Sequence, residues 1–489
     1  MTIRRTTLRK TMLLAGAAAL SAATITAASA QSTSVTPAEA KQGAEAHPQL
    51  LQEFGGAMTG PQAQYVEQVG KNIAVRSSLS GARDAFTVSL LNSSVNNAFA
   101  IPGGYIYATR QLVALMNNEA ELAGVLGHEV GHVAARHAQR RQKAATKNSI
   151  IGLLGTVLAG AVLGNSQLGQ LLGKGIQQGS QMLTLKFSRS QELEADKLGV
   201  QYLRSAGYDP RAMATVLLSL ASQNALDASL QGRNNATVPQ WASTHPDPAS
   251  RVRNAQTLAG AAIGNTNRDT FLTRIDGLTY GDDPAQGVIE GSQFIHPQFR
   301  LSFNAPSGFY MVNGTRAVSI NGQSGQAQLT TAPYNGNLES YITQVFAGIS
   351  QQQRIAPQSL QRTTVNGLPA AYGTARVNSG NGQVDVVVFA YQFSNNQAFH
   401  FVAISQAGRS GVFSPMFNSM RRISDSEAAG VIPRVVDVVT VGRNDTVQSL
   451  AARMAYTDAQ EQRFRVLNGL TSGQTVTQGQ KVKIVIRGR

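Results

Sequence analysis

The sequence is organised around one short stretch, His128-Glu129-Val130-Gly131-His132. The alanine- and leucine-rich run before it predicts a helix, on which residues four apart lie on one face, about one turn from each other. Two imidazoles placed in this way can bind a single zinc ion, and Glu129 can then hold and deprotonate the water that the ion acidifies. The alternative is an exposed helix with two solvated histidines, because alanine-rich helices also produce this pattern by chance.

A catalytic zinc ion needs a third protein ligand, and an acidic stretch further along the chain offers carboxylates. The run from Ser190 to Asp196 predicts a second helix. Helical spacing places Glu192 and Asp196 on one face of this helix and Glu194 on the far side. We therefore predict Glu192 as the third ligand and Asp196 as the acceptor that orients an imidazole. Taken alone, an acidic helix face is usually only solvated.

His137 competes with Glu192 for the role of third ligand, because it follows His132 by five residues on the same predicted helix. Metzincins place a glycine between these histidines, and their third histidine follows the second by six residues. Neither feature is present here. We predict a structural role for His137.

Three motifs carry a resemblance to a known family. They are Asn97-Ala98-Phe99-Ala100-Ile101-Pro102-Gly103-Gly104, His128 to His137, and Ser188-Arg189 with Glu192 to Asp196. Together they closely resemble the CAAX-prenyl-protease-like zinc metallopeptidases, peptidase family 48 among the gluzincins, and within it the secreted bacterial branch of β-barrel-assembly-enhancing proteases. The resemblance covers about Ala38 to Leu258. It implies His128, His132 and Glu192 as ligands of one zinc ion per chain, with Glu129 as the general base.

The resemblance also implies residues around the substrate cleft. The segment Asn97–Ala100 would border the cleft, where an extended substrate pairs with it as an added strand. His245 and Arg251 match a His-Pro and a following Arg of the family, which makes both candidate catalytic residues. His245 would either occupy the open coordination position and hold the protease latent, or stabilise the oxyanion alongside Arg251. We favour latency; without the resemblance, both residues would be assigned to the surface.

The composition limits the kind of metal site and the kind of partner. The 489 residues include no cysteine, which excludes disulfides, thiolate zinc ligands and a cysteine nucleophile. Nitrogen and oxygen atoms must therefore hold any metal. The formal net charge of +15 comes from basic residues that are spread along the chain. We interpret it as attraction to anionic envelope surfaces and expect no nucleic-acid partner.

The first thirty residues have the layout of a secretory signal peptide. Four basic residues precede an apolar run, and Ala28-Ser29-Ala30 precedes Gln31. We predict cleavage before Gln31 and a mature protein in the periplasm of a Gram-negative bacterium. A later apolar stretch, Ile150 to Leu163, is shorter than the ~20 residues that a membrane span requires. A buried helical hairpin is the favoured interpretation, and a peripheral membrane contact is the alternative.

Changes in composition divide the mature chain into three parts. We predict an α+β multidomain protein with a mainly helical gluzincin protease domain and a small β-sheet over residues 31–265. Helices are expected from about Thr109 to Met116 and from Glu119 to Lys147. An α+β domain over residues 270–425 follows, because short β-like segments rich in Gly, Asn and Gln replace the helical pattern. It is faintly similar to PsbP-type domains, and no role is assigned to it.

The last part, residues 434–489, is expected to fold as a small βααβ domain. The stretches Val438 to Ala451, Phe464 to Leu470 and Gln478 to Val485 resemble a degenerate LysM module. The resemblance implies binding of N-acetylglucosamine-containing glycan, and hence of peptidoglycan. Removal of this tail is expected to spare peptide hydrolysis. The alternative is an αβ tail without a ligand.

The sequence therefore predicts a zinc-dependent endopeptidase that acts on unfolded or envelope proteins in periplasmic quality control. One alternative is a chaperone-like outer-membrane assembly factor whose proteolysis is repressed. Another is a peptidoglycan-binding envelope protein with a vestigial enzyme, against which the intact zinc set argues. The assembly-enhancing members of the family carry a helical repeat domain after the protease, and no such period follows Asn265. Partners are therefore expected to differ.

Overall fold

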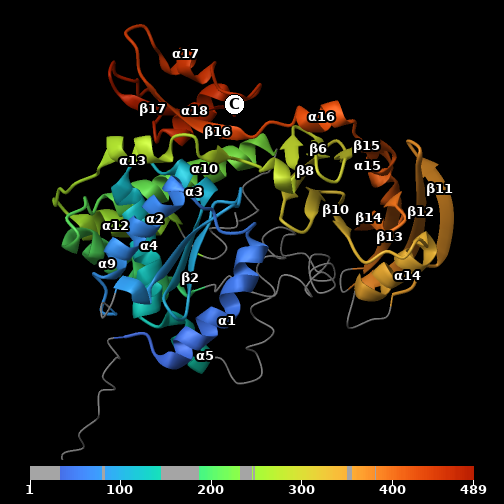
Figure 1. The fold of residues 1–489 in the computed structure, drawn as a ribbon, viewed down its shortest axis with the longest axis horizontal. Helices are drawn as coiled ribbons and strands as arrows, with labels where there is room; N and C mark the ends of the chain where they lie inside the picture. The colour runs from blue at the N-terminus through green and yellow to red at the C-terminus, as the bar shows by residue number, and fades with distance from the viewer. Residues whose placement is uncertain are drawn as a thin grey trace, which may run out of the picture. The chain divides into compact units, whose positions relative to one another are not determined.

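The computed structural model describes residues 34–79, 83–144, 187–231, 245, 248–349, 355–379 and 382–488. The expected signal peptide and the stretch from Ile150 to Leu163 lie outside these residues. Within the described ranges, no helix is both long enough and apolar enough to cross a membrane. Helices and sheets occupy different stretches of the described chain (Figure 1). Their buried apolar side chains form several separate hydrophobic cores. The mixed, multidomain class that the sequence predicts is confirmed.

The first part of the described chain is mainly helical. The helices are α1 (Pro37–Glu53), α2 (Pro61–Ala74), α3 (Arg110–Leu115), α4 (Glu119–Ala134), α5 (His137–Ala144), α9 (Arg189–Ser205), α10 (Ala212–Leu230), α12 (Pro248–Ala259) and α13 (Arg268–Ile275). Four of these described helices, α1, α3, α4 and α9, begin at residues whose side chains accept from free backbone N–H groups. Thr36 and Glu39 form a capping box at the start of the first helix, and Asn118 accepts from the backbone of Glu121 at the start of another. Most apolar side chains of these helices meet in one core.

A three-stranded sheet lies among these helices. Its strands β1 (Thr87–Leu91), β2 (Ala98–Ile101) and β3 (Tyr105–Thr109) are ordered β1-β3-β2, with β3 parallel to β1 and antiparallel to β2. Successive side chains of a strand point to opposite faces. Ala98 and Ala100 therefore belong to the main core, whereas Phe99 and Ile101 pack with Leu50 and Phe54 around α1. The strand order places β2 at an edge of this sheet.

The helix that carries the two motif histidines is shorter than the sequence predicts. One helix from Glu119 to Lys147 was the expectation, and this prediction is wrong, because α4 ends at Ala134 and α5 begins at His137. Between them Arg136 adopts a left-handed backbone with φ of 51°, in which a right-handed helix cannot continue. Its guanidinium donates to Oε1 of Glu39 at 3.0 Å. This contact anchors the corner to α1.

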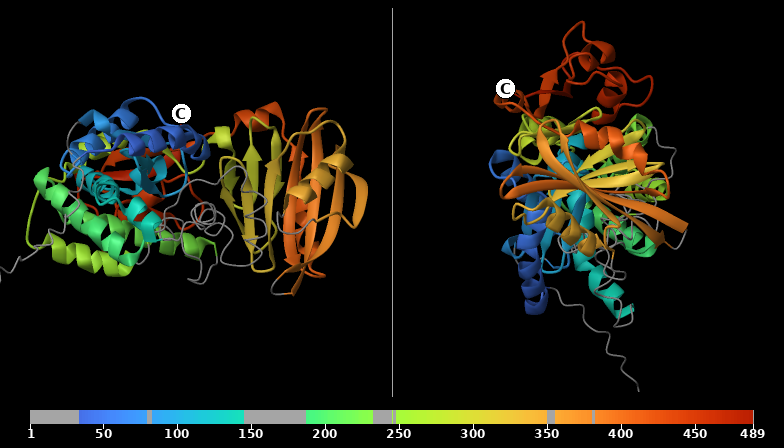
Figure 2. Two further views of the ribbon diagram at one scale, coloured as in Figure 1. Left: turned by 90° about the horizontal axis from the view of Figure 1, so that it is seen from below. Right: turned by 90° about the vertical axis from the view of Figure 1, so that its right-hand side faces the viewer.

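The middle part contains two antiparallel sheets with their own cores. A seven-stranded sheet has the order β11-β12-β13-β14-β10-β9-β8, and a four-stranded sheet has the order β15-β7-β6-β5. Figure 2 shows the strong twist of the larger sheet, in yellow and orange. Helix α14 (Leu338–Ile349) buries Tyr341, Ile342 and Phe346 against it. The remaining elements are β5 (Val288–Glu290), β6 (Gln293–His296), β7 (Leu301–Asn304), β8 (Phe309–Asn313), β9 (Val318–Gly322), β10 (Gly325–Thr331), β11 (Ser359–Val365), β12 (Leu368–Ser379), β13 (Gly382–Ser394), β14 (Gln397–Gln406), α15 (Ser414–Ser419), β15 (Arg421–Arg422) and α16 (Asp425–Ala429).

The last part has the predicted order of strand, helix, helix and strand. These are β16 (Arg434–Thr440), α17 (Val447–Ala451), α18 (Gln460–Leu467) and β17 (Lys481–Arg487), and the short strand β4 (Thr279–Tyr280) joins them in the order β17-β16-β4. Val436 of β16 is fully buried in the core of the helical part. Helix α13 packs its apolar side chains in that same core, although most of it falls in the range expected for the middle domain. The helical part therefore extends beyond residue 265, and the last part packs directly on it.

Candidate metal centre

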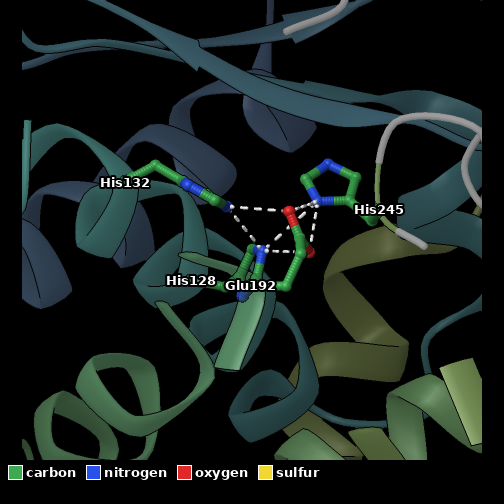
Figure 3. A group of neighbouring side chains, drawn as sticks. All are labelled: His128, His132, Glu192 and His245. Atoms are coloured by element: carbon green, nitrogen blue, oxygen red, sulfur yellow. Dashed lines mark hydrogen bonds and ion pairs between the residues drawn. The ribbon is translucent and has the colours of Figure 1, made fainter. Parts of the chain in front are cut away.

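Helix α4 places the motif side chains in the interior. His128, Glu129 and His132 are each less than 5% exposed. The Nε2 atoms of the two histidines lie 3.0 Å apart, one helical turn from each other (Figure 3). Such burial excludes the alternative of an exposed helix with two solvated imidazoles.

Helix α9 brings the carboxylates to the same point. Ser188 and Gln191 form a capping box at the start of this helix. Glu192 and Asp196 follow within the first turns and lie on the side that faces α4. Glu192 is fully buried, with its carboxylate oxygens 3.5 Å from Nε2 of His128 and 3.4 Å from Nε2 of His132. The structure thus joins Glu192 to the two histidines, as the sequence predicts.

The two glycines at the crossing explain how the helices approach so closely. A Cβ atom on Gly131 would lie 3.2 Å from the carbonyl oxygen of Ala195, and one on Gly199 would lie 3.1 Å from the backbone nitrogen of His128. Both distances are shorter than an ordinary Cβ contact, and the Cβ on Gly199 would also lie 2.6 Å from Cε of Met213. The glycine inside the motif therefore lets α9 come near enough for a carboxylate to reach the imidazoles.

The outer nitrogens of the two imidazoles are already engaged. Nδ1 of His128 lies 2.9 Å from Oδ1 of Asp196, and Nδ1 of His132 lies 2.8 Å from Nδ1 of His137. A neutral imidazole that donates from Nδ1 presents a lone pair at Nε2, the atom that a metal needs. Asp196 therefore orients His128. The donor set of buried imidazole nitrogen and carboxylate oxygen fits a metal ion of the zinc type.

His245 completes a group of four potential ligands. Its Nδ1 lies 3.0 Å from Oε2 of Glu192 and 3.3 Å from Nε2 of His128. One donor atom from each of His128, His132, Glu192 and His245 lies within 4.8 Å of all the others, and all four residues are buried. Figure 3 shows His245 facing Glu192 across the site. The flanking residues 241–244 and 246–247 lie outside the described residues.

Arg251 of α12 lies behind the centre, and the residue is only 1% exposed. It donates to both oxygens of Asp196, at 2.8 Å from Nε and 2.7 Å from Nη2, and its Nη1 lies 3.0 Å from Oε2 of Glu192. The charge of Arg251 thus faces two carboxylates. Together with the contact between Asp196 and His128, these bonds form a continuous chain from the guanidinium to an imidazole.

Burial and close charged neighbours shift the pKa values of His128, His132 and Glu192. Burial alone would raise the pKa of Glu192, but the positive field of His245 and hydrogen bonds from the surrounding imidazoles hold it far below the usual range. Burial lowers the pKa of His132 well below its ordinary value. Burial and the charge of Arg251 also act to lower the pKa of His128, but hydrogen bonds with Asp196 and Glu192 outweigh them and raise it to about 9. Glu192 is thus an anionic ligand at neutral pH.

Glu129 differs from Glu192 in having little hydrogen-bonding support. Burial raises its pKa, an effect that the nearby His245 opposes. Oε2 of Glu129 is buried without a hydrogen-bond partner among the described residues, and Oε1 lies 3.6 Å from Nε2 of His245. A buried carboxylate with a raised pKa and a free oxygen is suited to accept a proton from water.

Of the segment Asn97–Ala100, only Ala100 lines a hollow beside the metal-site helix. Ala98 to Ile101 form the edge strand β2, whose outer edge pairs with no other described strand. A small surface hollow beside this edge is lined by Ala100, Ile101 and Pro102 on one side and by His132 and Phe187 on another. Asn97 is fully buried just before the strand. The free edge therefore lies next to the metal-site helix.

The sequence did not reveal two contacts of His132. Nδ1 of His137 lies 2.8 Å from Nδ1 of His132, and Phe187 stacks on the His132 ring with centroids 3.8 Å apart. No motif marks Phe187. For His137 the metzincin spacing argued only against a role as a ligand, and the break between α4 and α5 that creates the contact was not predicted.

Comparison with known proteins agrees with this geometry. Residues 61–259 match the model of peptidase family M48. This part of the chain is therefore similar to members of that family. It is 33% identical over 199 residues to a β-barrel assembly-enhancing protease of Yersinia pestis, and 35% identical over 171 residues to the mitochondrial metalloendopeptidase OMA1 of Arabidopsis thaliana. These alignments cover 40% and 35% of this chain and only 38% and 30% of those proteins. The chain thus matches well under half of each relative.

A solved structure of PsbP from Synechocystis sp. PCC 6803 matches 27% of the chain, with 8% identity and a TM-score of 0.23. So low a score carries no argument about the middle part. The faint similarity of that part to PsbP-type domains stays a prediction.

Proposed function

We propose that this chain is a zinc-dependent endopeptidase of the periplasm that hydrolyses peptide bonds in unfolded or envelope proteins. The observation that carries the proposal is the buried centre itself, in which two imidazoles and Glu192 converge and Glu129 stands free beside them. Peptidase family M48 covers these residues, and relatives named as metalloendopeptidases share the region. The location rests on the predicted signal peptide.

Different residues of the chain have different roles in hydrolysis. His128, His132 and Glu192 would hold the metal, which when bound polarises a carbonyl and acidifies a water molecule. Glu129 accepts the proton of the attacking water, because its pKa is raised and one of its oxygens is free. The edge of β2 binds an extended polypeptide by backbone hydrogen bonds, which suits substrates of varied sequence. An unfolded protein offers such segments.

The test compares the wild-type protein with Glu129→Gln. Both proteins are expected to contain one zinc ion per chain, and only the wild type is expected to cleave casein. Loss of zinc from the variant would show that Glu129 holds the metal instead of activating water. Equal cleavage by both proteins would overturn the proposed chemistry.

His245 gives specific support to a second candidate, a chaperone-like assembly factor with repressed proteolysis. Its imidazole lies among the potential ligands, where it would compete with the catalytic water. A protease among unfinished envelope proteins needs such restraint. The two candidates differ in the fate of unfolded outer-membrane protein incubated with the wild-type chain, since fragments favour the endopeptidase and intact, soluble protein favours the chaperone.

Attachment to peptidoglycan through the LysM-like tail is a further part of the proposal. The loop from Gly442 to Asn444 is exposed, as a glycan-binding loop must be. Sedimentation with purified peptidoglycan, compared for the wild type and for Arg443→Glu, tests it. Equal pelleting of both proteins at low and moderate salt would argue against a glycan site in this loop.

A further inference from the structure

The orientation of His132 depends on a residue that is not one of the expected ligands. Nδ1 of His132 and Nδ1 of His137 are 2.8 Å apart, so one of them must carry the proton. Nε2 of His137 lies 3.2 Å from Oε2 of Glu194, which as a carboxylate can only accept. His137 therefore keeps its proton on Nε2 and accepts at Nδ1. It follows that Nδ1 of His132 is the donor and that its Nε2 is left with a lone pair.

The contact exists only because the helix breaks. On a continuous helix, residues five apart lie about 140° from each other around the axis, so the His137 ring would point away from His132. The left-handed Arg136 turns the chain, and the first residue of α5 folds back onto α4. The strained corner thus brings the two rings together.

His137 is itself held from several sides. Its side chain is fully buried, and its backbone oxygen accepts from Nε2 of Gln191 at 3.2 Å. Glu194, beyond it, accepts from Nη1 of Arg140 at 2.9 Å. The ring therefore has little freedom to leave His132.

We infer that His137 is a positioning residue that fixes the tautomer and direction of His132 for metal binding, with Glu194 and Arg140 behind it. The inference rests on the proposed function, because it concerns a metal held by His132. The two metal-binding imidazoles would then be oriented by chemically different groups. His128 is oriented by the ion pair of Asp196 and Arg251, and His132 is oriented by a neutral imidazole that leads to the surface.

Zinc affinity of the full-length protein tests this role, measured by competition with a chelator. Replacing the partner of a metal-bound imidazole typically weakens metal binding about 10–100-fold, and we expect a loss of this size in His137→Leu. In His137→Asn the amide oxygen can still accept from His132, so most of the affinity should return. The visible spectrum of the Co²⁺ form should change in the leucine variant and recover in the asparagine variant.

The control is His400→Leu, which removes another fully enclosed histidine, bonded to the Tyr341 hydroxyl at 2.8 Å in the middle part. Its zinc affinity should equal that of the wild type. If His137→Leu does not fold, Glu194→Gln at the more exposed end of the chain of bonds should still show a smaller loss.

The outcomes separate this inference from the proposed function. Zinc binding by the wild type and equally tight binding by folded His137→Leu would overturn the role of His137 alone. A wild-type protein that binds no zinc would overturn the proposed function together with it. Weak binding by both His137→Leu and His137→Asn would show that volume, not the accepted hydrogen bond, is what matters, and would also overturn the inference.

Discussion

Single side chains on α9 make the ligand assignment testable. Glu192 is fully buried among the imidazoles, whereas Glu194 is half-exposed and pairs with Arg140. We expect Glu192→Ala to lose zinc after dialysis, because it removes the carboxylate of a four-residue group whose other members are imidazole ligands. Glu194→Ala should still bind one zinc ion at saturating metal. Metal analysis of the purified proteins after dialysis against zinc buffer measures this, and the opposite pattern would refute the assignment of Glu192.

His245 permits a sharper test, because its two possible roles predict opposite mutants. As a restraint, it occupies the position of the catalytic water, and His245→Ala should then raise the rate of casein cleavage. As an oxyanion donor, its removal should lower kcat by about 10²–10³-fold. We predict the rise, since its Nδ1 lies among the potential ligands. Rates are compared at equal zinc content, and an unchanged rate would reject both roles.

The sequence predicts which site residues meet when they lie on one regular helix. It does not predict contacts that depend on a break in a helix. His128, His132 and Glu192 meet as predicted, because each pair needed only the regular geometry of α4 or α9. The partner of His132 was not foreseen, since the spacing from His132 to His137 points away on a continuous helix. A left-handed Arg136 has no clear sequence signal, because most such positions hold glycine or asparagine.

The elements of the site depend on how α4 and α9 cross, and Gly131 gives a prediction at this scale. A leucine there would press on the backbone of Ala195 and force α9 outward. We expect Gly131→Leu to lose zinc although no ligand is changed, and to be destabilised by about 1–3 kcal/mol, the usual cost of overpacking. Zinc content and urea unfolding measure the two effects.

Gly348 in α14 is the matched control for this change. Among the described residues, nothing lies within 4 Å of the Cβ that it would gain, so Gly348→Leu should keep zinc and gain slightly in stability from helix propensity. Retained zinc in Gly131→Leu would show that α9 does not need the close approach.

The mixture of strands and helix that the sequence predicts for the middle part is present, for a physical reason. Strands such as β13 and β14 alternate or run apolar over many residues, and α14 has a regular apolar face. The strand β2 was recognised only as a cleft segment, because four residues are too few to show a period. Pairing with β3, which a sequence pattern does not display, makes it a strand.

At the scale of the whole molecule, the last part is not a loosely attached tail. Val436 fills the core of the helical part, β4 adds to the sheet of β16 and β17, and Nη2 of Arg268 donates to the backbone oxygen of Lys481 at 2.7 Å. Removing residues 435–489 would expose apolar surface on the protease part. We therefore revise the expectation that truncation spares hydrolysis, and predict a lower melting temperature and weaker casein cleavage. Wild-type stability and activity after truncation would contradict this.

Lys483 of β17 also joins the last part to the helical part, and its side chain is fully buried. Its ammonium group donates to the backbone oxygens of Ala114 at 2.8 Å and Leu115 at 3.2 Å, and to that of Met116, at the end of α3. Burial lowers the pKa of Lys483 to about 7, against the opposing charge of Glu121. The loss of hydration on burial thus lowers the pKa of Lys483 by more than the charge of Glu121 raises it.

This shift predicts a pH dependence of stability whose sign follows from proton counts. The ordinary pKa is 10.5, so between pH 7 and 10.5 the unfolded chain binds a proton at Lys483 that the folded chain has released. The free energy of unfolding should therefore rise with pH across this window, by up to about 1.4 kcal/mol per pH unit from this group. Because other groups titrate too, the quantity to measure is the difference between wild type and Lys483→Met in urea unfolding at pH 7.5 and 9.5. Lys481→Met, at the surface of the same strand, is the control, and its free energy of unfolding should change with pH as in the wild type. If the free energy of unfolding of Lys483→Met also changes with pH as in the wild type, the buried ammonium group keeps its proton throughout.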